Sequence, residues 1–85
     1  MIMEFNLNEL LERLDPDVLK ADGFDDAVIG VASRCGSVDV LAYDVEKIIL
    51  KLMLDGMSRE EAEEYFEFNI LGAYVGEYTP VFISR

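Results

Sequence analysis

Apolar positions recur at helical spacing, every three or four residues, in three stretches of this sequence. The first follows Asn6, a typical helix cap, and a further helical turn is expected over residues 15–21, which begin with Asp-Pro. The second stretch follows Asp44 as its cap, and the third follows Ser58. The predicted core-facing positions are Leu7, Leu10, Leu11 and Leu14, then Val45, Ile48, Ile49, Leu52 and Met53, then Ala62, Tyr65, Phe66, Asn69, Ile70 and Ala73.

Three shorter stretches have the β-branched and aromatic composition of strands. Residues 27–32 are apolar on both alternating faces, and a short turn joins them to residues 38–43, which predicts a hairpin. Residues 79–83 read as a closing strand. Because residues 27–32 are apolar on both faces, we expect them at the centre of a three-stranded antiparallel sheet of order 2-1-3. The predicted fold is one α+β domain, residues 1–85, with element order α-β-β-α-α-β.

A capping box and a row of carboxylates mark the third predicted helix. The Ser58 hydroxyl can accept from the amide of Glu61, whose carboxylate can reach back to the amide of Ser58. Opposite the core-facing positions lie four glutamates, Glu60, Glu63, Glu64 and Glu67. They can form a solvated helix face, or a row of negative charge that imitates a phosphate backbone. Like charges four residues apart destabilise a helix slightly, which gives the binding interpretation as much weight as the solvated one.

The net charge of −11 on 85 residues restricts the class of partner. A surface this acidic repels nucleic acid and anionic membranes, so direct binding to either is not expected. A basic protein surface is the partner that the charge favours. The chain has one cysteine, no basic leader and no long apolar run, which predicts a reducing, cytoplasmic location without a signal peptide or membrane span.

No set of residues in the sequence predicts catalysis, a cofactor or a metal site. Cys35 follows Arg34, but the chain has no histidine, so a Cys-His pair and a structural zinc site are both excluded. We expect a reduced, partly buried thiol. The spacing of the aspartates between residues 15 and 26 differs from that of a calcium-binding loop, because Leu19 stands where the third ligand belongs. Asn69, on the apolar stripe, is expected to be buried and hydrogen-bonded.

Three segments of the chain resemble a family of small proteins encoded by bacteriophages and in environmental sequences. They are residues 29–36, residues 40–44 and residues 55–83, and the most specific part reads GAYVGEYTP. The resemblance covers about two thirds of the chain and implies no particular activity. Phage accessory proteins of this size often act by occupying a host protein, such as a defence nuclease, and acidic ones sometimes do so by resembling DNA.

The leading hypothesis is therefore a non-enzymatic binding module, a DNA-mimicking antagonist that occupies a basic, nucleic-acid-handling surface of a host protein. The alternative is a structural or assembly role through self-association, possible as a homodimer, with exposed aromatic residues at the contact. A third possibility is an enzyme that uses the loops around Arg34 and Glu77. The candidate partner-binding residues are Glu60, Glu63, Glu64, Glu67, Arg34, Glu77 and Tyr78, and the candidate self-association residues are Phe68, Tyr74 and Tyr78.

The two loops are expected to meet at one end of the sheet. Antiparallel pairing of the last strand with the first would place Glu77 beside Arg34, within ion-pair distance. The loop pair, with Tyr78 and the Cys35 turn, would then form a second contact surface separate from the glutamates.

Overall fold

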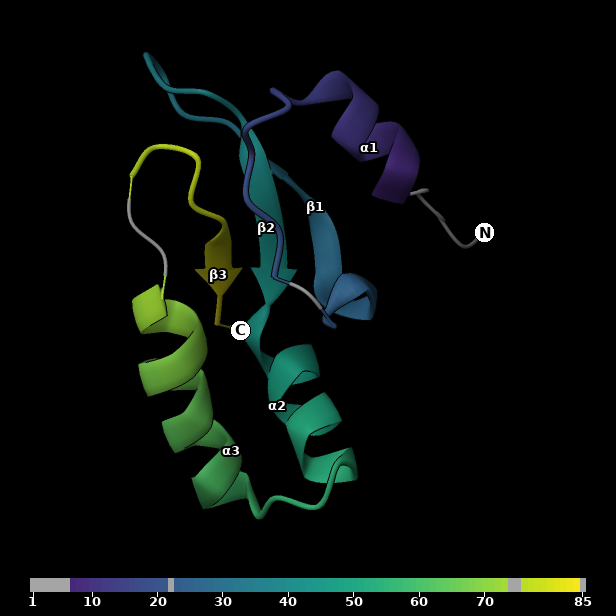
Figure 1. Cartoon of the computed structure of the whole chain (residues 1–85), viewed down its shortest axis with the longest axis vertical. Helices are drawn as coiled ribbons and strands as arrows, with labels where there is room; N and C mark the ends of the chain where they lie inside the picture. The colour runs from purple at the N-terminus through teal and green to yellow at the C-terminus, as the bar shows by residue number, and fades with distance from the viewer. Residues whose placement is uncertain (1–6, 22, 74–75, 85) are drawn as a thin grey trace.

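The computed structural model describes residues 7–21, 23–73 and 76–84, with the side chain of residue 8 excepted. Its elements follow the predicted order α-β-β-α-α-β, and the α+β class is confirmed (Figure 1). A 3₁₀ turn, Asp25–Ala27, precedes the sheet, while a π-helical turn, Phe66–Ile70, and a 3₁₀ turn, Leu71–Ala73, extend the third helix. The main elements are α1 (Leu7–Arg13), β1 (Val28–Ala32), β2 (Val40–Asp44), α2 (Val45–Leu54), α3 (Arg59–Tyr65) and β3 (Val81–Ile83).

The predicted antiparallel sheet of order 2-1-3 is wrong, because the sheet is mixed and its order is β1-β2-β3. Strand β1 runs antiparallel to β2, with Ala32 opposite Val40, and β3 runs parallel to β2, with Val81 opposite Ala42. All five residues of β2 are buried, whereas β1 has one exposed and three half-buried positions, so β2 takes the centre. Helices α2 and α3 form the crossover that a parallel strand pair requires.

The core lies on the side of the sheet that faces α3. Leu41 and Tyr43 of β2 are fully buried there with residues of α2 and α3. The Tyr43 hydroxyl accepts a hydrogen bond of 2.9 Å from the Ala21 amide, which ties the segment before β1 to the sheet. Phe82 continues the packing, since its ring centroid lies 5.6 Å from that of Tyr43 and 5.3 Å from that of Phe66 on the α3 extension.

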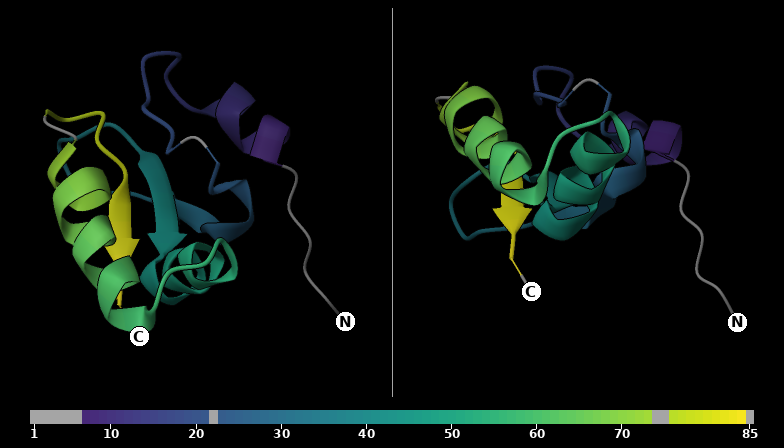
Figure 2. Two further views of the ribbon diagram at one scale, coloured as in Figure 1. Left: turned by 60° about the horizontal axis from the view of Figure 1, so that its bottom comes forward. Right: turned by 90° about the horizontal axis from the view of Figure 1, so that it is seen from below.

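The opposite side of the sheet is apolar as well, although no helix of the described chain covers it. Val40 and Ala42 are buried but lie outside the core cluster, because they point away from α3. Val81 and Ile83 share their face and are 37% and 38% exposed. Figure 2 shows α3 and the segment before β1 on one side of the sheet only. The fold therefore has two layers, and its outer sheet face is apolar except for the buried Asp44, which pairs with Ile83.

The caps predicted at the starts of α2 and α3 are both present. The Glu46 amide donates to Asp44 Oδ1 at 3.0 Å. Ser58 and Glu61 form the capping box, with hydrogen bonds of 3.1 Å from the Glu61 amide to Ser58 Oγ and 3.0 Å from the Ser58 amide to Glu61 Oε1. The hydrogen bond from the Ser58 backbone holds the pKa of Glu61 below its ordinary value. The start of α3 is therefore defined by local chemistry. The Asn6 cap lies outside the described residues.

The helical turn predicted over residues 15–21 does not form. The Asp15 side chain accepts from the Asp17 amide at 2.8 Å, and its carbonyl accepts from the Val18 amide at 3.0 Å, which makes a tight turn. Residues 18–21 form no helix, and the Leu19 amide donates to the carbonyl of Tyr78 at 3.1 Å. Aspartate thus begins a turn here instead of capping a helix.

The side of the third helix that faces the core is narrower than predicted. Ala62, Phe66 and Ile70 are buried at a constant spacing of four residues. Asn69 is exposed, and so are two further residues predicted on the stripe, Tyr65 and Ala73, so the prediction of a buried Asn69 is wrong. Tyr65, in the regular part of the helix, and Asn69, four residues further on, are exposed together, so the buried stripe holds only one residue in each turn.

Candidate functional site

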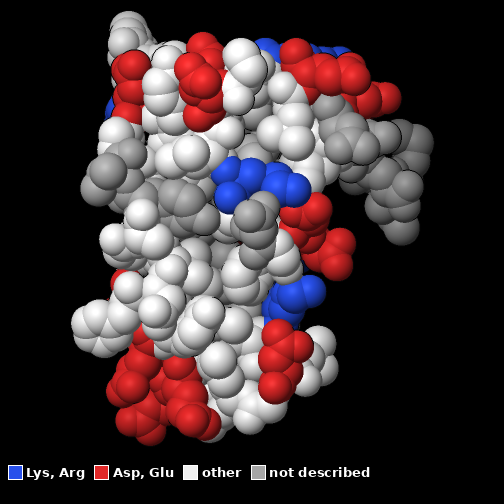
Figure 3. All heavy atoms as spheres, in the orientation of Figure 1, with Lys and Arg blue, Asp and Glu red and all other residues white. Residues whose placement is uncertain are grey.

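The four predicted glutamates are all exposed, and we call them the acidic face: Glu60, Glu63, Glu64 and Glu67. In Figure 3, acidic side chains gather at the end of the molecule where α3 begins. Three of the four line two hollows on different sides of the helix, and Glu60 lines neither. Glu63 and Glu67 line a hollow between α2 and α3, whereas Glu64 lines a shallower one with Tyr65 and Phe68 on another side of the helix.

The hollow between the two helices, here called the α2–α3 groove, has a volume of about 300 Å³. Carboxylates and an apolar floor meet in it, and its four ionised side chains carry a formal charge of −2. The groove is lined by Glu46, Glu63, Glu67, Arg59, Val45, Ile49, Phe66 and Ser84.

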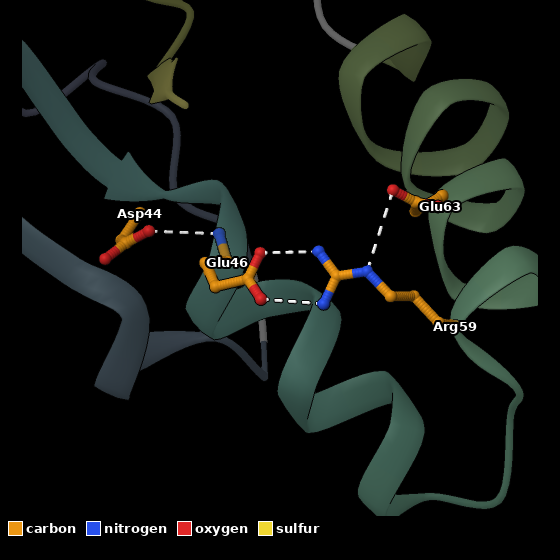
Figure 4. A network of polar contacts seen from close by, with 4 residues as sticks. All are labelled: Asp44, Glu46, Arg59 and Glu63. Atoms are coloured by element: carbon orange, nitrogen blue, oxygen red, sulfur yellow. Dashed lines mark hydrogen bonds and ion pairs between the residues drawn. The ribbon is translucent and has the colours of Figure 1, made fainter. Parts of the chain in front are cut away.

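Arg59 bridges the two helices at the edge of this groove (Figure 4). Its guanidinium donates two hydrogen bonds to the Glu46 carboxylate, of 2.7 and 2.8 Å, and its Nε lies 3.9 Å from Glu63 Oε2. The hydrogen bond from Arg59 lowers the pKa of Glu46, and Glu46 raises the pKa of Arg59. Within the described chain, Glu60, Glu64 and Glu67 have no cation within ion-pair distance. Most of the acidic face is therefore uncompensated.

The lowered pKa of Glu46 predicts a stability contribution that depends on pH. Because the pKa falls on folding, the contribution is present above the unfolded value of 4.5 and is lost as pH falls through the folded value. Glu46→Gln should therefore unfold at a lower temperature than the wild type near pH 7, and the difference should vanish at about pH 2. Thermal unfolding followed by circular dichroism measures this. Glu60→Gln is the control, and an equal effect of both substitutions would exclude the ion pair as the cause.

The predicted ion pair between Arg34 and Glu77 is wrong, although their loops do lie at the same end of the sheet. Arg34 donates from Nε and Nη2 to the Ser37 hydroxyl at 3.2 and 3.1 Å, and no described acidic group lies within ion-pair distance of it. The loops meet because β3 runs parallel to β2 and starts where β1 ends. The prediction that the two loops meet is therefore correct, although it was made from a wrong pairing of the last strand with the first.

Tyr78 and Cys35 do not complete the predicted loop surface. Tyr78 is half-buried and accepts at its carbonyl from Leu19, and the negative charge of Asp15 is the main cause that raises the pKa of its phenol. Tyr78 thus belongs with the turn after α1. Cys35 is exposed, which corrects the prediction of a partly buried thiol. Tyr74 lies outside the described residues.

The meeting loops form a second hollow, here called the sheet pocket, of about 450 Å³ on the outer face of the sheet. Three segments enclose it, the end of β1, the start of β2 and the loop before β3. One buried polar atom, Thr79 Oγ1, has no hydrogen-bond partner in the described chain. The sheet pocket is lined by residues 32–34, Val38, Val40, Gly76, Glu77 and residues 79–81.

The unpaired hydroxyl of Thr79 predicts that Thr79→Val stabilises the fold. A buried hydroxyl without a partner costs about 1–3 kcal/mol, and valine replaces it with a methyl group of similar shape. We expect the free energy of unfolding to rise by about 1 kcal/mol, measured by urea denaturation. Thr79→Ser, which keeps the hydroxyl, is the control, and a loss of stability in Thr79→Val would show that the hydroxyl is hydrogen-bonded in solution.

Glu46, Arg59 and Thr79 are the site residues that the sequence reasoning missed. The pair Arg59 and Glu63 is visible as an i, i+4 pattern, but the contact from Arg59 to Glu46 spans thirteen positions and depends on how α2 and α3 pack. No local pattern indicates that the Thr79 hydroxyl is buried.

Within the described residues, no three acidic or cysteine side chains are placed to hold a metal ion together. In the same part of the chain, none of the helices has the length and apolar character needed to cross a membrane. Comparison with protein-family models, curated proteins and solved structures finds no match for this chain.

Proposed function

We propose that this chain is a non-enzymatic binding module whose acidic face docks on a basic surface of a partner protein. The observation that carries the proposal is the α2–α3 groove, where three carboxylates surround an apolar floor beside further exposed glutamates. A lysine or arginine side chain has the matching chemistry, since its methylene stem can cover Val45 and Phe66 while its charge meets Glu63 or Glu67.

Arg59 supports the choice of a cationic partner, because it is an internal example of the proposed contact. Its guanidinium lies between Glu46 and Glu63 on neighbouring helices, with bidentate geometry toward Glu46. Glu67, in the same groove, has no such partner in the described chain. The net charge of −11 would add long-range attraction to a basic surface and speed association.

The partner is proposed to be a nucleic-acid-handling protein of a bacterial cell, such as a defence nuclease, which the chain would inhibit in the cytoplasm. Two observations support this finer proposal. The four glutamates of the acidic face span about 10 Å along the helix at 1.5 Å per residue, so they concentrate negative charge over a short length, as a nucleic-acid strand does. The resemblance of residues 55–83 to small phage proteins favours a role against a host protein.

A second candidate function, self-association, is favoured by exposed apolar side chains at the end of α3 and on its extension. Phe68 is 77% exposed, Leu71 is 49% exposed and Tyr65 is 40% exposed. An apolar group of this kind beside a charged surface is typical of contact sites. Sedimentation equilibrium tests it, since a monomer at all concentrations would exclude self-association.

Capture from a bacterial lysate tests the leading proposal. The immobilised chain should retain a protein with a basic surface at about 50 mM salt and release it as salt rises toward about 500 mM, because exposed charges are screened. Mass spectrometry identifies the retained protein, and its isoelectric point and its affinity for nucleic acid are then measured. A retained partner that is acidic, or that stays bound at about 1 M salt, would contradict the proposal.

A further inference from the structure

The sheet pocket is a second candidate site, on a different surface from the acidic face and independent of the function proposed for it. We propose that this pocket binds a small zwitterion with an apolar side chain, of the size of a free apolar amino acid. The inference rests on the shape of the pocket and on one positive and one negative side chain at its rim.

The shape of the pocket suits a small ligand. Its volume of about 450 Å³ falls in the range of small-molecule sites, and segments from three separate parts of the chain enclose it. The floor is apolar, because Val40 and Val81 point to the outer face of the sheet and Pro80 is buried beside them. Burial of an apolar side chain on this floor supplies the driving force for binding.

The charges at the rim select the ligand. Arg34 and Glu77 are both exposed and both line the pocket, and they do not pair with each other. Arg34 donates to the Ser37 hydroxyl from Nε and Nη2, so its Nη1 is left to donate to a carboxylate. Glu77 can accept from an ammonium group. A ligand that carries both groups satisfies both side chains.

The net charge of the protein argues against a simple anion in this pocket. A molecule with a carboxylate alone would be repelled by the charge of −11 and would lie near Glu77 without compensating it. A zwitterion has no net charge and avoids this repulsion.

A second copy of the chain is a weaker occupant of the same surface. The large apolar side chains exposed on the outer sheet face are Val81 and Ile83, each little more than a third exposed. A stable interface buries roughly 800 Å² on each partner, which is more than these two side chains provide. The loops on either side also make the face concave at this end. A small ligand fits a concave pocket, and a flat sheet-to-sheet contact does not.

Titration of the ¹⁵N-labelled chain with L-phenylalanine tests the proposal by NMR. Backbone amides of residues 32–40 and 76–81 should shift and saturate, and the amides of α3 should not. Two probes separate the charges: 3-phenylpropionate lacks the ammonium group and 2-phenylethylamine lacks the carboxylate. Each should bind at least about ten-fold more weakly, since each loses one charge-assisted hydrogen bond.

Two substitutions complete the test. Arg34→Gln and Glu77→Gln should each weaken L-phenylalanine binding by about ten-fold. Glu60→Gln, on α3, should leave it unchanged. The proposal is overturned if no amide saturates below about 20 mM, or if the two probes bind as well as the amino acid. It is also overturned if the same amides shift with protein concentration alone, which would indicate a contact between copies.

Discussion

Replacement of Phe66 by alanine is expected to lower the free energy of unfolding by about 3–5 kcal/mol, a large part of the stability of an 85-residue domain. Phe66 is 7% exposed, and its ring meets Phe82 edge to face across the layer between the α3 extension and the sheet. Alanine would leave a cavity at the point where the helices contact β3. The unfolding temperature should fall by at least about 12 °C.

Phe68→Ala is the matched control for this prediction, because it removes the same side chain two residues away. Phe68 is 77% exposed, so its replacement should change the free energy of unfolding by less than about 0.5 kcal/mol. Urea denaturation of both variants gives the comparison. Equal losses would mean that the helix does not present Phe66 to the core in solution and that the π-helical turn Phe66–Ile70 is not formed there.

Reversal of the acidic face to lysine at all four positions should weaken binding of the captured partner by at least about 100-fold. Each substitution puts a positive charge against a positive surface, and juxtaposed like charges cost several kcal/mol in a complex. The fold should persist, because all four side chains are exposed and the Ser58–Glu61 capping box is kept. Isothermal titration calorimetry measures the affinity, and circular dichroism checks the fold.

The matched control carries the same change of net charge on other elements. Four exposed acidic residues outside α3 are replaced by lysine, so that both variants move from −11 to −3 with two charges gained per substitution. The control should lose only the long-range part of the attraction, about ten-fold. Equal losses in the two variants would show that total charge, and not the acidic face, determines binding. The control positions are Glu9, Glu12, Asp26 and Asp39.

Local chemistry made the helices predictable from the sequence. The cap at Asp44 and the capping box at Ser58 involve residues two or three positions apart, and both formed as expected. The exposed position of the acidic face followed from the same helical periodicity. Where the local signal was ambiguous, the prediction failed: Asp15 begins a tight turn instead of capping a helix.

The sheet order was not predictable from strand composition alone. Residues of β1 and β2 are both apolar on alternating faces, so either strand could take the centre. The choice depends on the crossover through α2 and α3, which returns the chain beside β2 and covers one face of the sheet. Gly30 and the irregular register between Val28 and Gly30 also make β1 the less regular strand.

The candidate sites depend on packing that the sequence does not display. The α2–α3 groove requires the contact between Glu46 and Arg59, and the sheet pocket requires β3 to start where β1 ends. Asn69 shows the same limit on a smaller scale, because the buried stripe of the third helix holds only one residue in each turn and leaves Asn69 at the surface. Long-range pairing and packing decided these features.

Competition with duplex DNA is the most direct test of the claim that the acidic face occupies a nucleic-acid-binding surface. The captured partner is bound to the fluorescently labelled chain, and its release is followed by anisotropy as unlabelled duplex is added at constant salt. The account predicts complete, competitive displacement of the chain by duplex, with no complex of all three components. A stable ternary complex, in which DNA and the chain occupy the partner together, would contradict it.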